Sequence, residues 1–247
     1  IAILVWYYGN SGRNNIDSTR AGMIMECGSL GIFSDENFLC MRHPGYGTVE
    51  GHSPSRLYGG DDICYRAGTI CDGFEQPDFD DSAFSPAVVY ENEVWGDCYE
   101  RPIPMHRFSA PASLRETAFR DGLHHYSLAH AMTFSPWLKV KASGGEILRF
   151  DTDRSVVPGG PGDHHNRYNS QIFEYVCKRG DNEFRFPAYL YGEELTVSFP
   201  PSLSPEIGII ESGYDCDITG SFRCDNELLN RLVDKAARTL YVCMRDN

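Results

Sequence analysis

The sequence predicts a mainly β protein, with two antiparallel, jelly-roll-like β-sandwich domains followed by one helix. The composition gives the first indication, because 14 Phe, 14 Tyr and 3 Trp accompany 24 Gly and 14 Pro, which is typical of many strands joined by turns. The second half then alternates apolar and polar residues with a period of two. Beyond Gly220 the apolar residues recur every three to four positions, which indicates a helix.

The first half offers fewer regular patterns. Ile1–Tyr8 is a continuous apolar run, so we expect a fully buried strand that ends at a Gly-Asn-Ser-Gly turn. Because the sequence opens directly on such a strand, we also expect it to be part of a longer protein. Ala21–Cys27 predicts a second strand, and residues 28–87 predict short strands and loops. Two further short strands are expected at Val88–Tyr90 and Val94–Tyr99.

The second half contains clear strand patterns. In Trp137–Ala142, the side chains of Leu138, Val140 and Ala142 share one face, while two lysines share the other, which predicts a half-buried strand. After a Ser-Gly-Gly turn, Leu148 and Phe150 share a face in the same way. Ile172–Lys178 and Glu183–Phe186 flank a polar turn and predict a hairpin, and a final alternation covers Leu195, Val197 and Phe199. Successive strands with short turns favour an antiparallel sandwich.

The last segment predicts an amphipathic helix. Leu228, Leu232, Ala236 and Leu240 recur every four residues, and Asp225 is a suitable N-cap. Such a helix can pack on the sandwich or begin an all-α domain, and the second alternative is favoured. The proline-rich stretch Pro102–Pro104 suggests a domain boundary nearby. We therefore expect domains at 1–106, 107–219 and 220–247.

Charge and composition exclude several partner classes. The net charge of −13 would repel nucleic acid, and it fits a neutral ligand such as a sugar, or solubility alone. No apolar run approaches the roughly 20 residues of a membrane-spanning helix. Nine cysteines include no C-x-x-C pair, so they predict no zinc site, and most are expected to be small buried hydrophobes. The sequence does not specify a compartment, although a periplasmic or secreted location is slightly favoured.

Few residues suggest chemistry. No nucleophile motif, phosphate-binding loop, dinucleotide motif or metal-ligand spacing occurs, so we predict no catalytic residue, cofactor or metal. His164, His165 and Arg167 lie in a long Gly/Pro loop and are candidates for substrate contact. Other residues have an ordinary structural explanation beside a functional one: the acidic pairs Asp61–Asp62, Asp80–Asp81 and Glu193–Glu194, the alternating Asp215 and Asp217, the histidines His124, His125 and His130, and the ring side chains Trp95 and Trp137.

Three stretches resemble α-L-rhamnosidases, specifically the region before their catalytic domain. Ile1–Gly9 with Arg20–Gly22 resembles a late strand of the family's N-terminal jelly roll. Asp72–Phe84 resembles the family's W-x-x-P-x-F-D-D-S-x-W segment, with phenylalanines in place of both tryptophans. Gly220–Asn230 is similar to the entry into the catalytic helical barrel. The order of the three stretches is more specific than any one of them.

The resemblance implies that the helix is the first of an α/α barrel that belongs to an inverting glycosidase with acidic catalytic residues. No residue of this sequence matches the family's catalytic motif. The expected role is therefore a non-catalytic accessory or scaffold region, whose partners are a rhamnosylated carbohydrate and the helical catalytic domain of the same parent chain. The alternatives are a stand-alone carbohydrate-binding β-sandwich module, which would not need the terminal helix, and an adhesion sandwich, which paired cysteines would favour.

Overall fold

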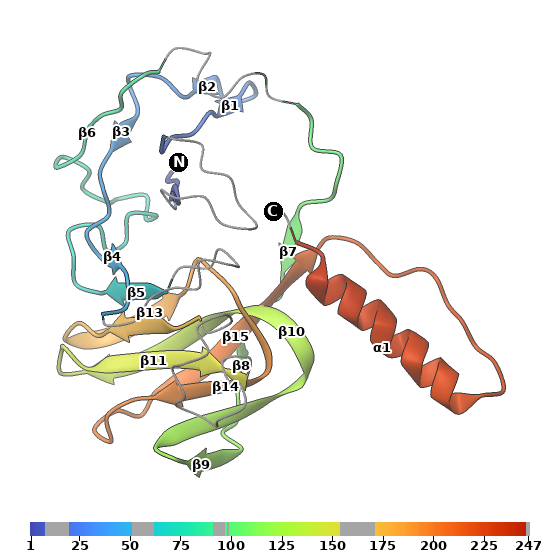
Figure 1. The fold of residues 1–247 in the computed structure, drawn as a ribbon. Coiled ribbons are helices and arrows are strands. Elements are labelled where there is room, and N and C mark those ends of the chain that lie inside the picture. Colours follow the sequence, from blue (N-terminus) through green and yellow to red (C-terminus); the bar gives the residue numbers. More distant parts are fainter. Residues whose placement is uncertain (8–19, 51–61, 91–96, 98, 154–170, 246–247) are drawn as a thin grey trace.

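The computed structural model describes residues 1–7, 20–50, 62–90, 97, 99–153 and 171–245, and the structural statements below concern these residues. The prediction of a mainly β protein with one C-terminal helix is confirmed (Figure 1). The elements are β1 Glu26–Cys27, β2 Ile32–Phe33, β3 Leu39–Cys40, β4 Tyr46–Gly47, β5 Ile63–Arg66, β6 Ser85–Pro86, β7 His106–Phe108, β8 Ala112–Ser113, β9 Ala118–Arg120, β10 Leu123–Ala142, β11 Ile147–Thr152, β12 Phe173–Val176, β13 Gly180–Arg185, β14 Leu190–Ser198, β15 Glu206–Tyr214 and α1 Glu227–Cys243.

One large mixed sheet dominates the fold. Its 11 strands follow the order β4-β5-β12-β11-β14-β10-β15-β7, while β9 and β13 also pair with β10, and β8 pairs with β15. The pairing of β5 with β12 is parallel, and the other pairings in this sheet are antiparallel. The strands β1 and β2, and likewise β3 and β6, form two-stranded sheets that lie apart from the large sheet (Figure 1).

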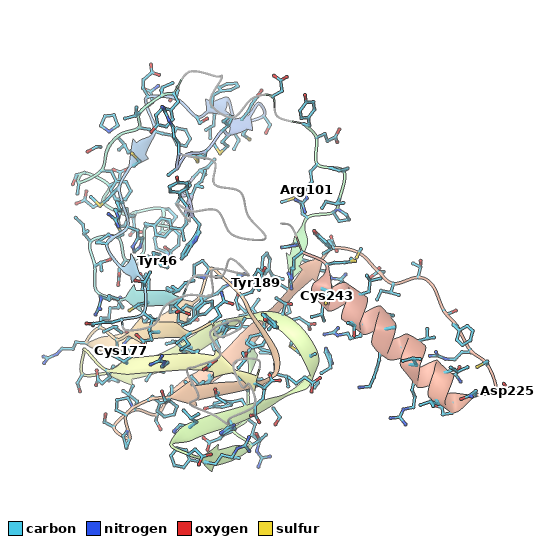
Figure 2. All side chains as sticks on the ribbon, in the orientation of Figure 1. Tyr46, Arg101, Cys177, Tyr189, Asp225 and Cys243 are labelled. Atoms are coloured by element: carbon cyan, nitrogen blue, oxygen red, sulfur yellow. The ribbon has the colours of Figure 1, made fainter. Side chains whose placement is uncertain are left out.

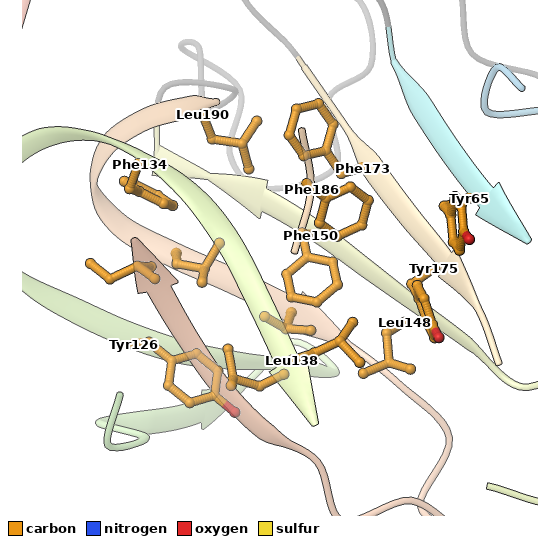
Figure 3. Close-up of a cluster of buried hydrophobic side chains, with 14 of the residues drawn as sticks. Tyr65, Tyr126, Phe134, Leu138, Leu148, Phe150, Phe173, Tyr175, Phe186 and Leu190 are labelled. Carbon is orange, nitrogen blue, oxygen red and sulfur yellow. The ribbon is translucent and has the colours of Figure 1, made fainter. Parts of the chain in front are cut away.

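The 20-residue strand β10 gives the large sheet its shape. Its first half pairs with β14 and its second half with β13 and β15. The register against β14 shifts between Ser127 and Met132, and such an irregularity bends a strand. The sheet therefore folds around a core in which the Phe186 ring lies 5.0 Å from that of Phe173 and 5.4 Å from that of Phe150 (Figure 3).

The predicted alternation of buried and exposed residues is confirmed in this core. Leu138 and Val140 are buried while their lysine neighbours are exposed. Leu148, Phe150, Leu195 and Val197 are each completely buried, as their period of two predicts. Strand β15, which was not expected from the sequence, supplies Ile207, Ile209 and Ile210.

The predicted hairpin between Ile172 and Phe186 is wrong. Strand β12 pairs with β11 and β5, whereas β13 pairs with β10, so the two consecutive strands lie in different parts of the folded sheet. The reason is the buried side chain of Asn182, whose Oδ1 accepts hydrogen bonds from Tyr175 Oη and from Lys178 N, both at 2.9 Å. Its Nδ2 donates to the carbonyls of Lys178 and Gly180 at 2.9 Å. These four bonds take the place of pairing across the turn.

The expected first strand is also wrong. Residues 1–7 form no strand, and Ile1 is 76% exposed; Val88–Tyr90 is likewise irregular, with Val88 74% exposed. Only Glu26–Cys27 of the predicted strand Ala21–Cys27 is in strand β1. An apolar run becomes a buried strand only where another layer covers it, and the described residues place no such layer over these segments.

Strand β5 joins the first half of the sequence to the large sheet. Tyr65 stacks on Phe184 at 4.1 Å, and the carboxylate of Asp72 forms an ion pair with Lys178 at 3.1 Å. A segment of the predicted domain 1–106 is therefore part of the sheet that residues after 105 mostly build. The division into two sandwich domains stays a prediction.

We expect the contacts of the Asp72 carboxylate, including its ion pair with Lys178, to weaken in acid. Burial tends to raise the pKa of this carboxyl, but hydrogen bonds from Gly68 N, from the Lys178 ammonium and from Thr69 N outweigh it and lower the pKa below its usual value. Because the pKa of Asp72 is lowered in the folded state, its carboxylate contributes fully to the free energy of unfolding above the unfolded pKa of about 3.9. This contribution is lost as the pH falls through the folded pKa.

Urea unfolding of Asp72→Asn and of the unchanged protein at pH 7 and at pH 3 tests this expectation. The variant should be the less stable at pH 7, and the difference should shrink at pH 3. The exposed Asp78→Asn variant is the control. A difference that does not depend on pH would contradict the role of the Asp72 charge.

The cysteines differ from the expectation of general burial. Cys64, Cys71 and Cys177 are buried, but Cys40 and Cys243 are exposed and three more are half-buried. All eight cysteines in the described ranges are free thiols. The adhesion alternative, which paired cysteines would favour, gains no support from them.

Candidate functional site

The predicted substrate-contact residues His164, His165 and Arg167 lie outside the described residues, as do Asp61 and Trp95. Trp137 is only 8% exposed and thus packs in the sheet. Asp62 is buried and accepts a hydrogen bond from Ile172 N at 2.7 Å.

The other acidic candidates have separate local contacts. Hydrogen bonds from the Ser82 hydroxyl and from Ser82 N lower the pKa of Asp80. Asp215 and Asp217 form exposed ion pairs with Arg107. Within the described ranges, no group of three or more His, Cys, Asp or Glu side chains could hold a metal ion. In the same part of the chain, no helix has the length and apolar character needed to span a membrane.

The junction between α1 and the sheet is the most developed candidate site. Asn226, and not the expected Asp225, caps the helix, because its side-chain oxygen reaches Leu228 N at 3.0 Å and Leu229 N at 3.3 Å. Asn230 binds the backbone of Cys224 through both of its amide atoms and so fixes the segment that enters the helix. The helix projects from the sheet, with Cys243 beside the sheet and Asp225 at the far end (Figures 1 and 2).

Polar and aromatic side chains attach the C-terminal end of α1 to the sheet. Arg238 Nη2 lies 2.6 Å from Glu211 Oε1, and Tyr241 Oη donates to the carbonyl of Tyr214 at 3.2 Å. Arg245 Nη2 donates to the carbonyl of Ser212 at 2.5 Å, and its guanidinium lies 5.0 Å from the centre of the Tyr189 ring. Burial among these groups lowers the pKa of the Arg245 guanidinium.

Gly213 makes this attachment possible. A Cβ at residue 213 would meet the Tyr241 hydroxyl and would lie only 2.5 Å from Cζ and 2.7 Å from Cε1 of that ring. Two guanidinium groups also lie near this ring, since Arg107 Cζ is 6.0 Å and Arg238 Cζ is 5.8 Å from its centre. A side chain at residue 213 therefore has to displace the end of the helix.

We expect Gly213→Ala to release the C-terminal end of α1 from the sheet. Backbone amides near Tyr241 should exchange with solvent at least about tenfold faster, because the opening free energy of the helix end falls. Hydrogen exchange measured by mass spectrometry gives this rate. Gly220→Ala is the matched control, because a Cβ there meets nothing within 4 Å. Unchanged exchange in Gly213→Ala would contradict the close fit.

The apolar side of α1 faces away from the sheet. Arg238 and Tyr241 are three residues apart and share the side of the helix that meets the sheet, while the leucines of the apolar stripe lie on the other side; Arg245 follows the end of the helix. The leucines of the stripe are exposed by 43 to 72%: Leu228 72%, Leu229 43%, Leu232 59% and Leu240 63%. A helix in contact with water normally buries such a stripe against its own domain. This arrangement can receive a further apolar element.

The sequence indicated the apolar stripe but missed the attachment residues. A usable signal was present for two of them, because Arg238 and Tyr241 are three residues apart and therefore share a helix face. Glu211 and Gly213 are on β15, a strand that was not predicted from the sequence. Their contacts with the helix could therefore not be predicted either.

Comparison with known proteins adds an independent finding. No protein-family model matches the chain. An α-L-rhamnosidase of Formosa agariphila is 23% identical over 201 residues, which cover 72% of this chain and 20% of that protein. The chain thus spans about one fifth of the length of this curated relative.

Solved structures show the same fold. The α-L-rhamnosidase from Streptomyces avermitilis, complexed with L-rhamnose, superposes with a TM-score of 0.56 and 19% identity over 74% of this chain and 19% of that one. The α-L-rhamnosidase from Dictyoglumus thermophilum gives a TM-score of 0.52 and 22% identity over 71% of this chain and 20% of that one. The chain is therefore distantly similar to a limited part of the α-L-rhamnosidases.

Proposed function

We propose that this chain is a non-catalytic accessory and scaffold region of an α-L-rhamnosidase-like glycoside hydrolase that acts on rhamnose-containing glycans or glycosides. The distant similarity to α-L-rhamnosidases supports the enzyme class. The observation that carries the scaffold role is the direction of α1, which is attached to the sheet by Arg238 and Tyr241 and turns its leucines outward.

In this proposal, α1 is the first helix of an α/α barrel, and its partner is the helical catalytic domain of the same parent chain. Residues 1–106 form an incomplete jelly roll, residues 107–219 a second β-sandwich that braces the barrel, and residues 220–247 the start of the barrel. The loop with His164, His165 and Arg167 would contact a carbohydrate substrate. An apolar stripe of this size is typical of a surface that another helix covers.

The proposal predicts that the purified 247-residue chain does not hydrolyse an aryl α-L-rhamnoside. No motif for the two carboxyl groups that an inverting glycosidase needs was found in the sequence. Release of 4-nitrophenol from 4-nitrophenyl α-L-rhamnoside should not exceed the rate without protein. Turnover that increases in proportion to protein concentration would overturn the non-catalytic role.

A further inference from the structure

A half-buried histidine lies where the first half of the chain joins the large sheet. The centre of the His43 ring is 4.8 Å from that of Tyr46, 5.7 Å from that of Tyr65 and 5.9 Å from that of Phe74. These rings come from β4, β5 and the segment after β5. The chain reaches His43 from the small β3–β6 sheet and continues into β4 at the edge of the large sheet (Figure 1). His43 therefore packs in a joint between two sheets.

A backbone hydrogen bond fixes the protonation state of the imidazole. Gly45 N donates to His43 Nδ1 at 3.1 Å, so Nδ1 carries no proton and the proton of the neutral ring is on Nε2. The carbonyl of Gly45 in turn accepts a hydrogen bond from Arg66 N of β5 at 2.8 Å. The fit is close, because a Cβ at residue 45 would lie 2.9 Å from the Arg66 carbonyl oxygen and 3.0 Å from His43 Cε1. Gly45 thus links the imidazole directly to the edge of the large sheet.

Protonation of His43 is incompatible with this link. A proton on Nδ1 turns the acceptor into a donor, so two N–H groups would face each other across the same short distance. The backbone of Gly45 is buried, and its N–H would lose its partner. The chain between His43 and β4 must then move away from β5.

The charged groups near the imidazole do not compensate for this loss. The carboxylates of Asp72 and Glu75 favour the protonated ring, but burial outweighs them and lowers the pKa of His43. Burial raises the pKa of Tyr46 to about 12 and also raises that of Tyr65, so both hydroxyl groups are uncharged when the histidine titrates.

We propose that His43 makes this joint acid-sensitive, so that its protonation releases β4 from the edge of the large sheet. The Tyr46 ring also contacts the Trp6 ring at 5.9 Å, so the N-terminal segment rests on the strand that is released. Because the pKa of His43 is lowered in the folded state, the stabilisation is complete above the unfolded pKa of about 6.5 and is lost as the pH falls through the folded pKa. The joint concerns the stability of the chain itself and does not depend on the proposed scaffold role.

Hydrogen exchange of the full-length chain at pH 7 and pH 5, measured by mass spectrometry and corrected for the intrinsic effect of pH on exchange, tests the joint. At pH 5, protection of the Gly45 and Arg66 amides should fall at least about fivefold, whereas that of β11 should not change. Asp72 remains ionised at pH 5 because its pKa is lowered, so its ion pair with Lys178 is not the cause. Equal protection of Gly45 and Arg66 at both pH values would overturn the proposal.

His43→Asn separates the charge of the histidine from its hydrogen bond. The side-chain oxygen of asparagine can accept from Gly45 N in place of Nδ1 and does not titrate, so protection should no longer depend on pH. His130→Asn is the matched control, because the side chain of His130 is 43% exposed on β10 and the variant should keep the pH dependence. A pH dependence that persists in His43→Asn would rule out His43 as its origin.

A measurement on the unchanged protein covers the case in which His43→Asn does not fold. The imidazole nitrogen resonances of the ¹⁵N-labelled chain should show a bare Nδ1 and a protonated Nε2 for His43 at pH 7. The same resonances should titrate below the ordinary histidine pKa of about 6.5. A protonated Nδ1 at pH 7, or titration at or above that value, would also overturn the proposal.

Discussion

Replacing Asn182 with alanine is expected to lower the free energy of unfolding by about 3–5 kcal/mol, because several buried groups lose their partners at once. Asn182 is 3% exposed. Without its side chain, Lys178 loses a partner at its N–H and at its carbonyl, as do the Tyr175 hydroxyl and the carbonyl of Gly180. Water cannot replace these bonds without opening the turn between β12 and β13.

Urea denaturation followed by circular dichroism measures this loss. Asn37→Ala is the matched control, because Asn37 also uses its amide in a hydrogen bond, to Asp35 at 3.0 Å, but on the exposed surface. The control should change stability by no more than about 0.5 kcal/mol. A loss below about 1 kcal/mol in Asn182→Ala would show that the turn holds without this side chain.

The second large effect is expected from Phe186→Ala, at about 3–5 kcal/mol. The Phe186 side chain is completely buried and contacts the rings of Phe150, Phe173 and Phe184 at centroid distances of 5.0 to 5.4 Å. These rings come from β11, β12 and β13, so their contact holds the folded sheet together. Its removal leaves a cavity that the surrounding strands cannot easily close.

Thermal and urea unfolding of Phe186→Ala give the magnitude. Phe33→Ala is the control, because Phe33 is 52% exposed in the small β1–β2 sheet. This substitution should lower the free energy of unfolding by less than about 1 kcal/mol. Equal losses of unfolding free energy in the two variants would contradict the role of the Phe186 ring contacts in stabilising the folded sheet.

The sequence predicted best what depends on local alternation. The burial of Leu148 and Phe150, and of Leu195 and Val197, follows from a period of two, because neighbours on a strand point to opposite faces. The pairing between strands could not be predicted in this way. For Ile172–Phe186 the local pattern is that of a hairpin, and the outcome depends on Asn182, whose four hydrogen bonds could not be read from the order of the residues.

The candidate sites show the same limit. The amphipathic character of α1 was predictable, and the cap was missed by one position because Asp225 and Asn226 are both suitable residue types. Which side of α1 would meet the sheet depended on Tyr241 finding space over Gly213, a contact between distant segments. Likewise, His125, a candidate from the sequence, contacts Glu194 only because β10 pairs with β14.

The parallel pairing of β5 with β12 has a consequence for the order of folding. The hydrogen bond from Ile172 N to Asp62 joins residues 110 positions apart. Closing such a long loop loses more chain entropy before any contact offsets it than closing the loop that pairs Ala142 of β10 with Gly180 of β13, which are 38 positions apart. The edge of the sheet at β4 and β5 should therefore assemble late, on a preformed β10–β15 nucleus. During that interval, β12 presents an open edge to which any other extended chain could add.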